Sequence, residues 1–250
     1  MILGLFKRWR GAGPTVAETE WHEAESCLPF LGHLSPEERR LLRSMALQLI
    51  AEKEWHGAQG LVLGQAIQLS IALQACLPVL KLGLDWYRGW LGIIVYPGDF
   101  VIPRSIIDDD GIVHEYDDTV LGEAWEGGPV LLSWFDPADD ADDADGINVV
   151  IHEFAHKLDM RNGQPDGLPP LHPGMSRRAW IAAFTPALEN FRARVDGQEE
   201  TLLDPYGAES PAEFFAVMSE AFFETPDLLH QQYPEVYAQL RLFYRQETRR

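Results

Sequence analysis

Two histidines, His152 and His156, stand four residues apart and are separated by Glu153-Phe154-Ala155. On an α-helix, residues four apart lie on one face about one turn apart, so both imidazoles can point at one metal ion. Glu153 lies about 100° around that helix, where its carboxylate flanks the metal and can accept a proton from a zinc-activated water. The segment therefore predicts a catalytic Zn²⁺ site on a helix.

The apolar residues around this segment repeat at helical spacing and mark the side of the helix that should be buried. The two histidines lie off this stripe and are expected to face a cleft. The alternative is a pair of ordinary surface histidines on an amphipathic helix. The stripe consists of Ile147, Val150, Ile151, Phe154 and Leu158.

A catalytic zinc usually takes three protein ligands and leaves one position for water, so a third ligand must come from another segment. The downstream candidates are His172, Glu213, Glu220 and Glu224. Glu213 and Glu220 are seven residues apart and lie on nearly the same face of one predicted helix. Glu213 also completes Ser210-Pro211-Ala212-Glu213, a pattern typical of a capping box. Spacing alone leaves both carboxylates open as the third ligand.

Asp159 follows the second histidine by three residues, on the same face of the predicted helix. Two interpretations are open for it. Its carboxylate either orients a ligand imidazole from behind, or is solvated near the helix end and paired with Arg161.

The remaining pattern predicts helices, then a small sheet, then helices again, which is an α+β fold in one compact unit. Residues 1–27 are expected to be loosely ordered and residues 28–250 to form a single domain. The strand at 130–134 precedes the predicted metal helix and is expected to pair with extended substrate backbone. Helices are expected after Ser35 and at 65–80, 147–160, 176–195, 211–224 and 232–246, and strands at 91–96, 112–116 and 130–134.

The composition excludes several classes of function. A net charge of −19 is opposite in sign to that of a protein that binds nucleic acid through phosphate neutralisation, and an anionic membrane surface would repel it. Cys27 and Cys76 are too few for a disulfide framework and are expected to be buried thiols. The acidic run 136–145 fails the calcium-loop pattern and is expected to be a solvated loop. With no convincing export signal, a cytoplasmic location is expected.

Several short segments, in this order, resemble the Mlc titration factor A family of zinc metallopeptidases. Together they span roughly residues 30–245, and the segments around the two histidines and around Glu213 are far more specific than the two-histidine spacing alone. The matching segments are Cys76-Leu77-Pro78-Val79-Leu80, Leu82-Gly83-Leu84, Tyr96-Pro97, Gly128-Pro129-Val130 to Trp134, His152-Glu153-Phe154-Ala155-His156-Lys157-Leu158-Asp159 and Pro211-Ala212-Glu213 to Ser219-Glu220.

The resemblance implies a zincin-like peptidase fold related to the catalytic domain of anthrax lethal factor. It assigns His152, His156 and Glu213 as zinc ligands and Glu153 as the catalytic base. It also implicates Tyr206, seven residues before Glu213, as a group that donates a hydrogen bond to the developing oxyanion. Family members have aminopeptidase-type activity, so a peptide substrate is implied.

Two other functions stay open beside peptide hydrolysis. The family is linked to the glucose repressor Mlc, so the chain could be a regulatory protein that binds such a repressor and uses zinc mainly for shape. A zinc hydrolase acting on non-peptide amides is the third alternative.

Overall fold

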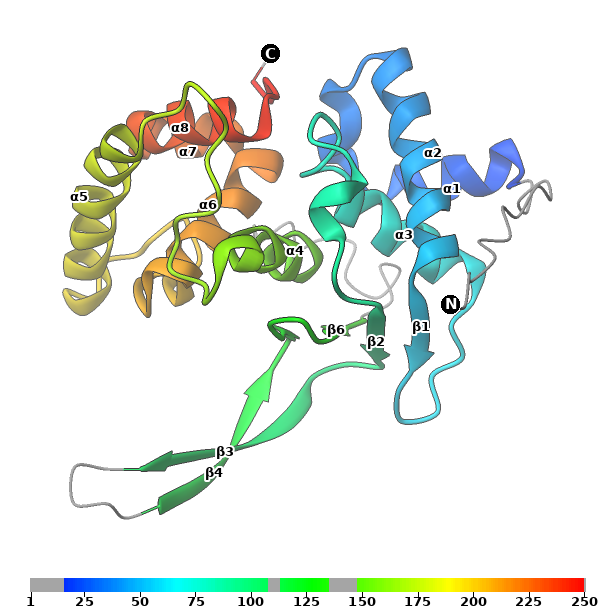
Figure 1. Cartoon of the computed structure of the whole chain (residues 1–250), viewed down its shortest axis with the longest axis horizontal. Helices are drawn as coiled ribbons and strands as arrows, with labels where there is room; N and C mark the ends of the chain where they lie inside the picture. Colours follow the sequence, from blue (N-terminus) through cyan, green and yellow to red (C-terminus); the bar gives the residue numbers. More distant parts are fainter. Residues whose placement is uncertain (1–15, 108–112, 135–147, 250) are drawn as a thin grey trace, which may run out of the picture.

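The computed structural model describes residues 16–107, 113–134 and 148–249, and its helices form two groups with one helix between them. Figure 1 shows α4 (Val149–Asp159) between the N-terminal helices and the C-terminal helices. This placement brings α4 against both groups, so residues from distant parts of the sequence can meet on it. The N-terminal group is α1 (Glu18–Ser26), α2 (Pro36–Glu52) and α3 (Gln65–Cys76), and the C-terminal group is α5 (Arg177–Asp196), α6 (Pro211–Glu224), α7 (Pro226–Gln232) and α8 (Pro234–Tyr244).

A four-stranded sheet lies beside α4 in the order β1-β2-β6-β5. Its strands are β1 (Glu54–Gly57), β2 (Gly92–Tyr96), β5 (Gly122–Ala124) and β6 (Val130–Ser133). β1, β2 and β6 are parallel, whereas β5 runs antiparallel to β6 and forms the edge of the sheet.

The strand expected to pair with substrate is therefore an interior strand, and that prediction was wrong. All four residues of β6 are buried between β2 and β5. The edge position belongs to β5, whose three residues carry too little pattern to be recognised from sequence.

A long two-stranded ribbon, β3 (Phe100–Ile107) and β4 (Val113–Val120), projects away from the sheet in Figure 1. Its antiparallel register runs from Phe100↔Val120 to Ile107↔Val113. β4 covers residues 113–116 of the strand expected at 112–116, residue 112 being outside the described part, whereas the sequence did not indicate β3. The ribbon leads directly into β5, which starts two residues after β4 ends.

One hydrophobic cluster joins the two helix groups and the sheet, with members from Trp21 on α1 to Tyr244 on α8. On the buried face of α4, Phe154 packs edge-on against Tyr87 and Trp90, with ring centroids 5.0 and 5.7 Å away. Aromatic rings thus pack on one face of α4, and polar groups can occupy the opposite face.

Most predicted helices are present, with differences at the ends of the chain. Glu18–Ser26 forms α1 with Trp21 buried, so the loose order expected for residues 1–27 does not hold for this segment; residues 1–15 lie outside the described part. The helix expected at 232–246 is α8, whereas α7, which precedes it and ends at Gln232, was not predicted; a new helix starts at Pro234. Cys76 is buried as expected, but Cys27 is exposed. The run 136–145 lies within 135–147, outside the described residues.

Candidate metal centre

The first turn of α4 is fixed to helices on both sides through Asn148. The side-chain oxygen of Asn148 caps the helix by accepting a hydrogen bond from the backbone N–H of Ile151 at 2.9 Å. Its side-chain nitrogen donates to Gln74 on α3 at 2.8 Å and to Glu224 on α6 at 2.7 Å. α4 therefore starts at a defined position relative to α3 and α6.

His152 and His156 project from one face of α4 toward Glu213 on α6. Their Nε2 atoms are 3.1 Å apart, and Glu213 Oε2 lies 2.9 Å from the first and 3.1 Å from the second. Ligand atoms around a tetrahedral zinc with bonds of about 2.0–2.1 Å lie about 3.3 Å from one another. The three converging atoms therefore fit around one such ion, and two imidazoles with one carboxylate are a known catalytic zinc donor set.

Glu213 serves both its own helix and this centre. Its backbone N–H donates to the Ser210 hydroxyl at 3.1 Å, which caps α6, while its carboxylate turns toward the two imidazoles. Burial raises the pKa of this carboxyl, but when the facing ring nitrogens of His152 and His156 carry protons, their hydrogen bonds and charges outweigh burial and lower the pKa to about 2. The group therefore stays ionised, as a metal ligand must be.

Glu220, the other carboxylate left open by the spacing, lies behind His152 instead of joining the three atoms. It is 1% exposed, with Oε1 at 2.7 Å from His152 Nδ1 and Oε2 accepting from the Asn148 backbone N–H at 2.5 Å. In a neutral His152 whose Nδ1 donates to this carboxylate, the Nε2 lone pair faces Glu213, which is the arrangement that a metal ligand needs. The structure thus separates two carboxylates that spacing could not.

Glu153 is buried against the edge strand, next to but outside the three converging atoms. A Cβ placed on Gly122 of β5 would lie 2.5 Å from Glu153 Oε1, and Glu153 is 4% exposed. Burial raises the pKa of Glu153 to about 7, against the opposing charges of the two histidines. A carboxyl with this pKa can both accept and release a proton near neutral pH.

A cavity of about 490 Å³ opens over these groups. α4 forms its floor, β5 one wall, and α6 with the segment 204–209 the other. Tyr206 belongs to this second wall: it is 44% exposed, and its ring centroid lies 6.0 Å from that of His152. The cavity lining includes Val120 to Ala124, Val149, Met160, Pro165, Asp204, Tyr206 and Glu209 beside the residues named above.

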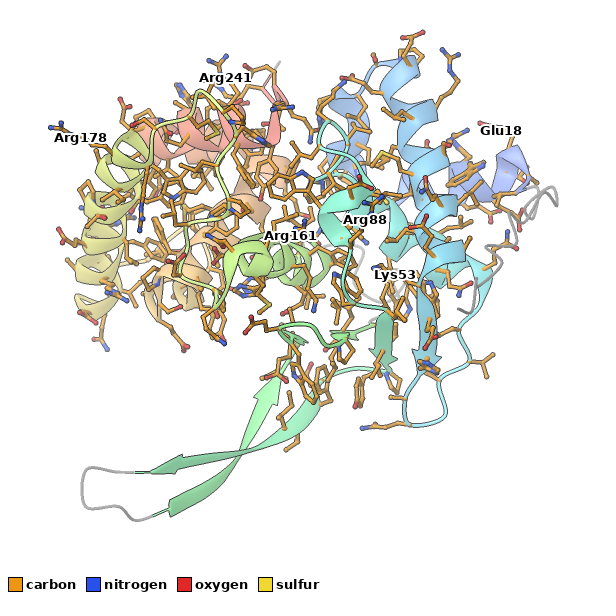
Figure 2. The ribbon with its side chains drawn as sticks, viewed as in Figure 1. Glu18, Lys53, Arg88, Arg161, Arg178 and Arg241 are labelled. Atoms are coloured by element: carbon orange, nitrogen blue, oxygen red, sulfur yellow. The ribbon has the colours of Figure 1, made fainter. Side chains whose placement is uncertain are left out.

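Asp159 follows neither interpretation offered by the sequence. It is fully buried, and Oδ2 accepts from the backbone N–H of Gly167 at 2.7 Å. Gly167 has φ +76°, and a Cβ placed there would lie 2.4 Å from the Pro211 carbonyl oxygen. Asp159 therefore holds the loop that packs on the start of α6. Arg161 instead donates to the Arg88 carbonyl oxygen at 3.3 Å, and both arginines are labelled in Figure 2.

Two other residues were missed or misplaced by sequence reasoning. His172, a candidate third ligand, donates from Nε2 to the Phe243 carbonyl oxygen at 2.7 Å, and its ring packs on Trp86 and Phe243, so it is structural. Lys157 donates to the carbonyl oxygens of Trp125 and Gly128 and fastens the turn after β5 to α4. A buried lysine on a helix carries no sequence signal that distinguishes it from an exposed one.

Comparisons with known proteins show the family of this chain. The pattern of the family described as "Glucose-regulated metallo-peptidase M90" matches residues 6–245. The Mlc titration factor A of Klebsiella pneumoniae (strain 342) is 40% identical over 233 residues, covering 92% of this chain and 87% of the relative. That of Yersinia pestis (strain Pestoides F) is 40% identical over 251 residues, covering 99% and 91%.

The chain belongs to the glucose-regulated metallo-peptidase M90 family. The resemblance to the Mlc titration factor A family is thereby confirmed, and the protein is a metallopeptidase with a mixed, helix-rich α+β fold. Membership in this family implies a metal ion, and His152, His156 and Glu213 form the one group in the described residues that could hold it. None of the helices in the described residues is both long enough and apolar enough to cross a bilayer.

Proposed function

We propose that this M90 member is a zinc-dependent peptidase of zincin-like architecture, and that His152, His156 and Glu213 hold the zinc ion. The observation that carries the proposal is the convergence of three lone-pair atoms within 2.9–3.1 Å of one another. A bound zinc ion supplies Lewis acidity, which polarises a carbonyl oxygen and makes a water molecule acidic near neutral pH.

Glu153 is the proposed general base. Its carboxylate accepts a proton from the attacking water and then delivers that proton to the leaving amine. Burial beside the two imidazoles supports this role, because it raises the pKa of Glu153 to about 7. Tyr206 is proposed to donate a hydrogen bond to the oxyanion, supported by its place on the cavity wall near His152.

The edge strand β5 is the proposed guide for the substrate backbone. It lines the cavity from Gly122 to Ala124, and within the described part of the chain β6 is the one strand that pairs with it. An extended peptide can add to the other edge as a further strand, which aligns the scissile bond along the floor of the cavity.

The charge of the cavity supports an aminopeptidase preference. Beyond Glu153, Glu213 and Glu220, three further carboxylates line it, and no lysine or arginine occurs among its described lining residues. Such a lining attracts the ammonium group of a free amino terminus and repels a carboxylate terminus. The further carboxylates are those of Glu123, Asp204 and Glu209.

Amino-acid anilides and amino-terminally blocked peptides, assayed with and without a chelator, test this function. We expect cleavage of the free anilides, loss with the chelator, recovery with added zinc, and little cleavage of the blocked peptides. Faster cleavage of blocked peptides would contradict the aminopeptidase preference. Activity that resists complete metal removal would contradict the metal mechanism.

A second function rests on the name of the relatives, which describes titration of Mlc. We propose that this chain also binds a repressor of that kind in the cytoplasm, without direct contact with nucleic acid. The net charge of −19 supports a protein partner over DNA. Binding of purified repressor to His156→Ala separates the cases: binding without hydrolysis shows an independent regulatory role, and loss of both ties the role to the metal.

We also propose that residues 28–250, together with α1, form a single metallopeptidase domain. Its support is the one hydrophobic cluster that runs through both helix groups and the sheet. A single unfolding transition followed by two spectroscopic probes is the expected result.

A further inference from the structure

The edge strand and the metal helix approach each other closely at one point. A Cβ placed on Gly122 would lie 2.5 Å from Glu153 Oε1, 2.6 Å from Glu153 Cγ and 2.7 Å from Val149 Cγ2. These distances are shorter than any stable carbon contact, so no side chain larger than hydrogen fits while the neighbours stay in place. The backbone of Gly122 is not in the left-handed region, so the requirement here is one of space and not of conformation.

The strand side of this contact is held firmly. Gly122 pairs with Leu132 in the antiparallel register of β5 and β6. The residue before it is also bound: the backbone N–H and the hydroxyl of Ser133 both donate to the Leu121 carbonyl oxygen, at 2.7 and 2.6 Å. β5 therefore cannot retreat from α4 without breaking bonds to β6.

The helix side is held as well. Asn148 fixes the first turn of α4 to α3 and α6, and Lys157 ties a later turn to the carbonyl oxygen of Trp125, just beyond β5. Since neither backbone can move away cheaply, an added methyl group at position 122 must displace the Glu153 side chain.

Packing is also what fixes the Glu153 carboxylate. Its Oε2 is buried and has no hydrogen-bond partner among the described residues. A carboxylate without a bond at that oxygen depends on its steric neighbours for its orientation.

We propose that Gly122 is a positioning residue for Glu153: its missing side chain lets β5 form a close wall that holds the carboxylate beside the two histidines. This inference rests on the proposed function, because it concerns the base of that reaction. It assigns to the edge strand a task beyond guiding substrate, carried out through backbone atoms alone.

Gly122→Ala tests the proposal. We expect kcat to fall about tenfold to 100-fold, while KM and the zinc content of the purified protein stay within twofold of wild type. A crystal structure of the variant is expected to show the Glu153 carboxylate displaced, which is a readout independent of activity. Gly64→Ala is the matched control, because a Cβ there meets nothing within 4 Å; it is expected to keep wild-type kcat.

A double-mutant cycle shows whether Gly122 acts through Glu153. In a Glu153→Gln background, Gly122→Ala is expected to change the residual rate by less than twofold, because the base it positions is already removed. An equal loss in both backgrounds, or wild-type kcat in Gly122→Ala, would overturn the inference.

The cycle also separates this inference from the proposed function. Wild-type activity in Glu153→Gln alone would remove the base and the inference together, whereas loss there with no effect of Gly122→Ala removes the inference only. If Gly122→Ala does not fold, Gly122→Ala with Val149→Ala relieves the contact with Val149 and keeps the contact with Glu153. The same loss of kcat is expected in that variant, relative to Val149→Ala alone.

Discussion

The two walls of the cleft meet the metal helix in different ways. α6 reaches α4 through buried carboxylates: Glu213 contacts both imidazole Nε2 atoms, and Glu220 holds the far nitrogen of His152. β5 reaches α4 through backbone, with Gly122 packed on Glu153. The comparison suggests a division of tasks. We propose that the α6 wall determines whether a metal ion is held, and that the β5 wall determines where the base and the substrate lie.

The largest effect is expected from a change on the α6 wall. Glu213→Ala removes one of the three proposed ligands, so both bound zinc and peptidase activity should be lost, the latter by about 10⁴-fold or more. Metal analysis of the purified variant measures the first and an anilide assay the second. Glu189→Ala, at an exposed position on α5, is the control and should match wild type. Full zinc occupancy in Glu213→Ala would show that this wall does not hold the metal.

A change beside the β5 wall should separate metal binding from catalysis. Glu153→Gln keeps the shape of the side chain but cannot accept a proton, so the rate should fall roughly 10²–10⁴-fold. Zinc content should equal that of wild type, because Glu153 is not one of the three converging groups. Loss of zinc in Glu153→Gln would contradict the proposed division of tasks, because the side of the cleft next to β5 would then also be needed for metal binding.

Glu220→Gln probes the support behind a ligand on the α6 wall. Zinc affinity is expected to fall about 10- to 100-fold, because the amide holds the His152 Nδ1 proton less strongly than a carboxylate. Competition with a chromophoric chelator measures this affinity. Saturating zinc should restore most of the rate, since Glu220 lies behind His152 and not among the three converging atoms. A rate that stays low at saturating zinc would assign Glu220 a direct part in the reaction.

The smallest effect is expected at the far end of α4, where Asp159 holds the loop against α6. Burial raises the pKa of Asp159 to about 6, and its hydrogen bond from Gly167 opposes this only in part. Between about pH 4 and 6 the folded state therefore binds more protons than the unfolded state, so this group lowers the stability as pH rises through that window.

Asp159→Asn removes this titration but keeps an oxygen that accepts the Gly167 N–H. Its free energy of unfolding, measured by urea denaturation of metal-free protein, should decline less than that of wild type from pH 4 to 6, by about 1–3 kcal/mol. An identical pH dependence in the two proteins would show that Asp159 does not titrate in this window.

The sequence was informative where one helix carries the chemistry and less so where two segments meet. The spacing of His152 and His156 predicts their shared face, because that relation is local to α4. Glu213 and Glu220 could not be separated, because seven residues place both on one side of α6, and only the packing of α6 on α4 decides which converges with the two histidines. The buried role of Asp159 likewise depends on Gly167, in a loop that no periodicity describes.

The clearest error of the sequence analysis was the prediction that the strand at 130–134 pairs with substrate, and this error has a physical cause. Val130 to Ser133 is a strong apolar strand, and such strands are typical of a buried position between neighbours. The true edge, Gly122 to Ala124, is short and contains a glycine that weakens any strand signal. Gly122 therefore weakens the strand pattern in the sequence, and in the structure it packs against Glu153.

X-ray diffraction at the zinc absorption edge, on crystals of the zinc-loaded protein, tests the central claim most directly. The account predicts one anomalous peak per chain, about 2.0–2.2 Å from Nε2 of His152, Nε2 of His156 and a carboxylate oxygen of Glu213. A peak bound by Glu220 in place of Glu213, or no peak between the two imidazoles, would contradict it.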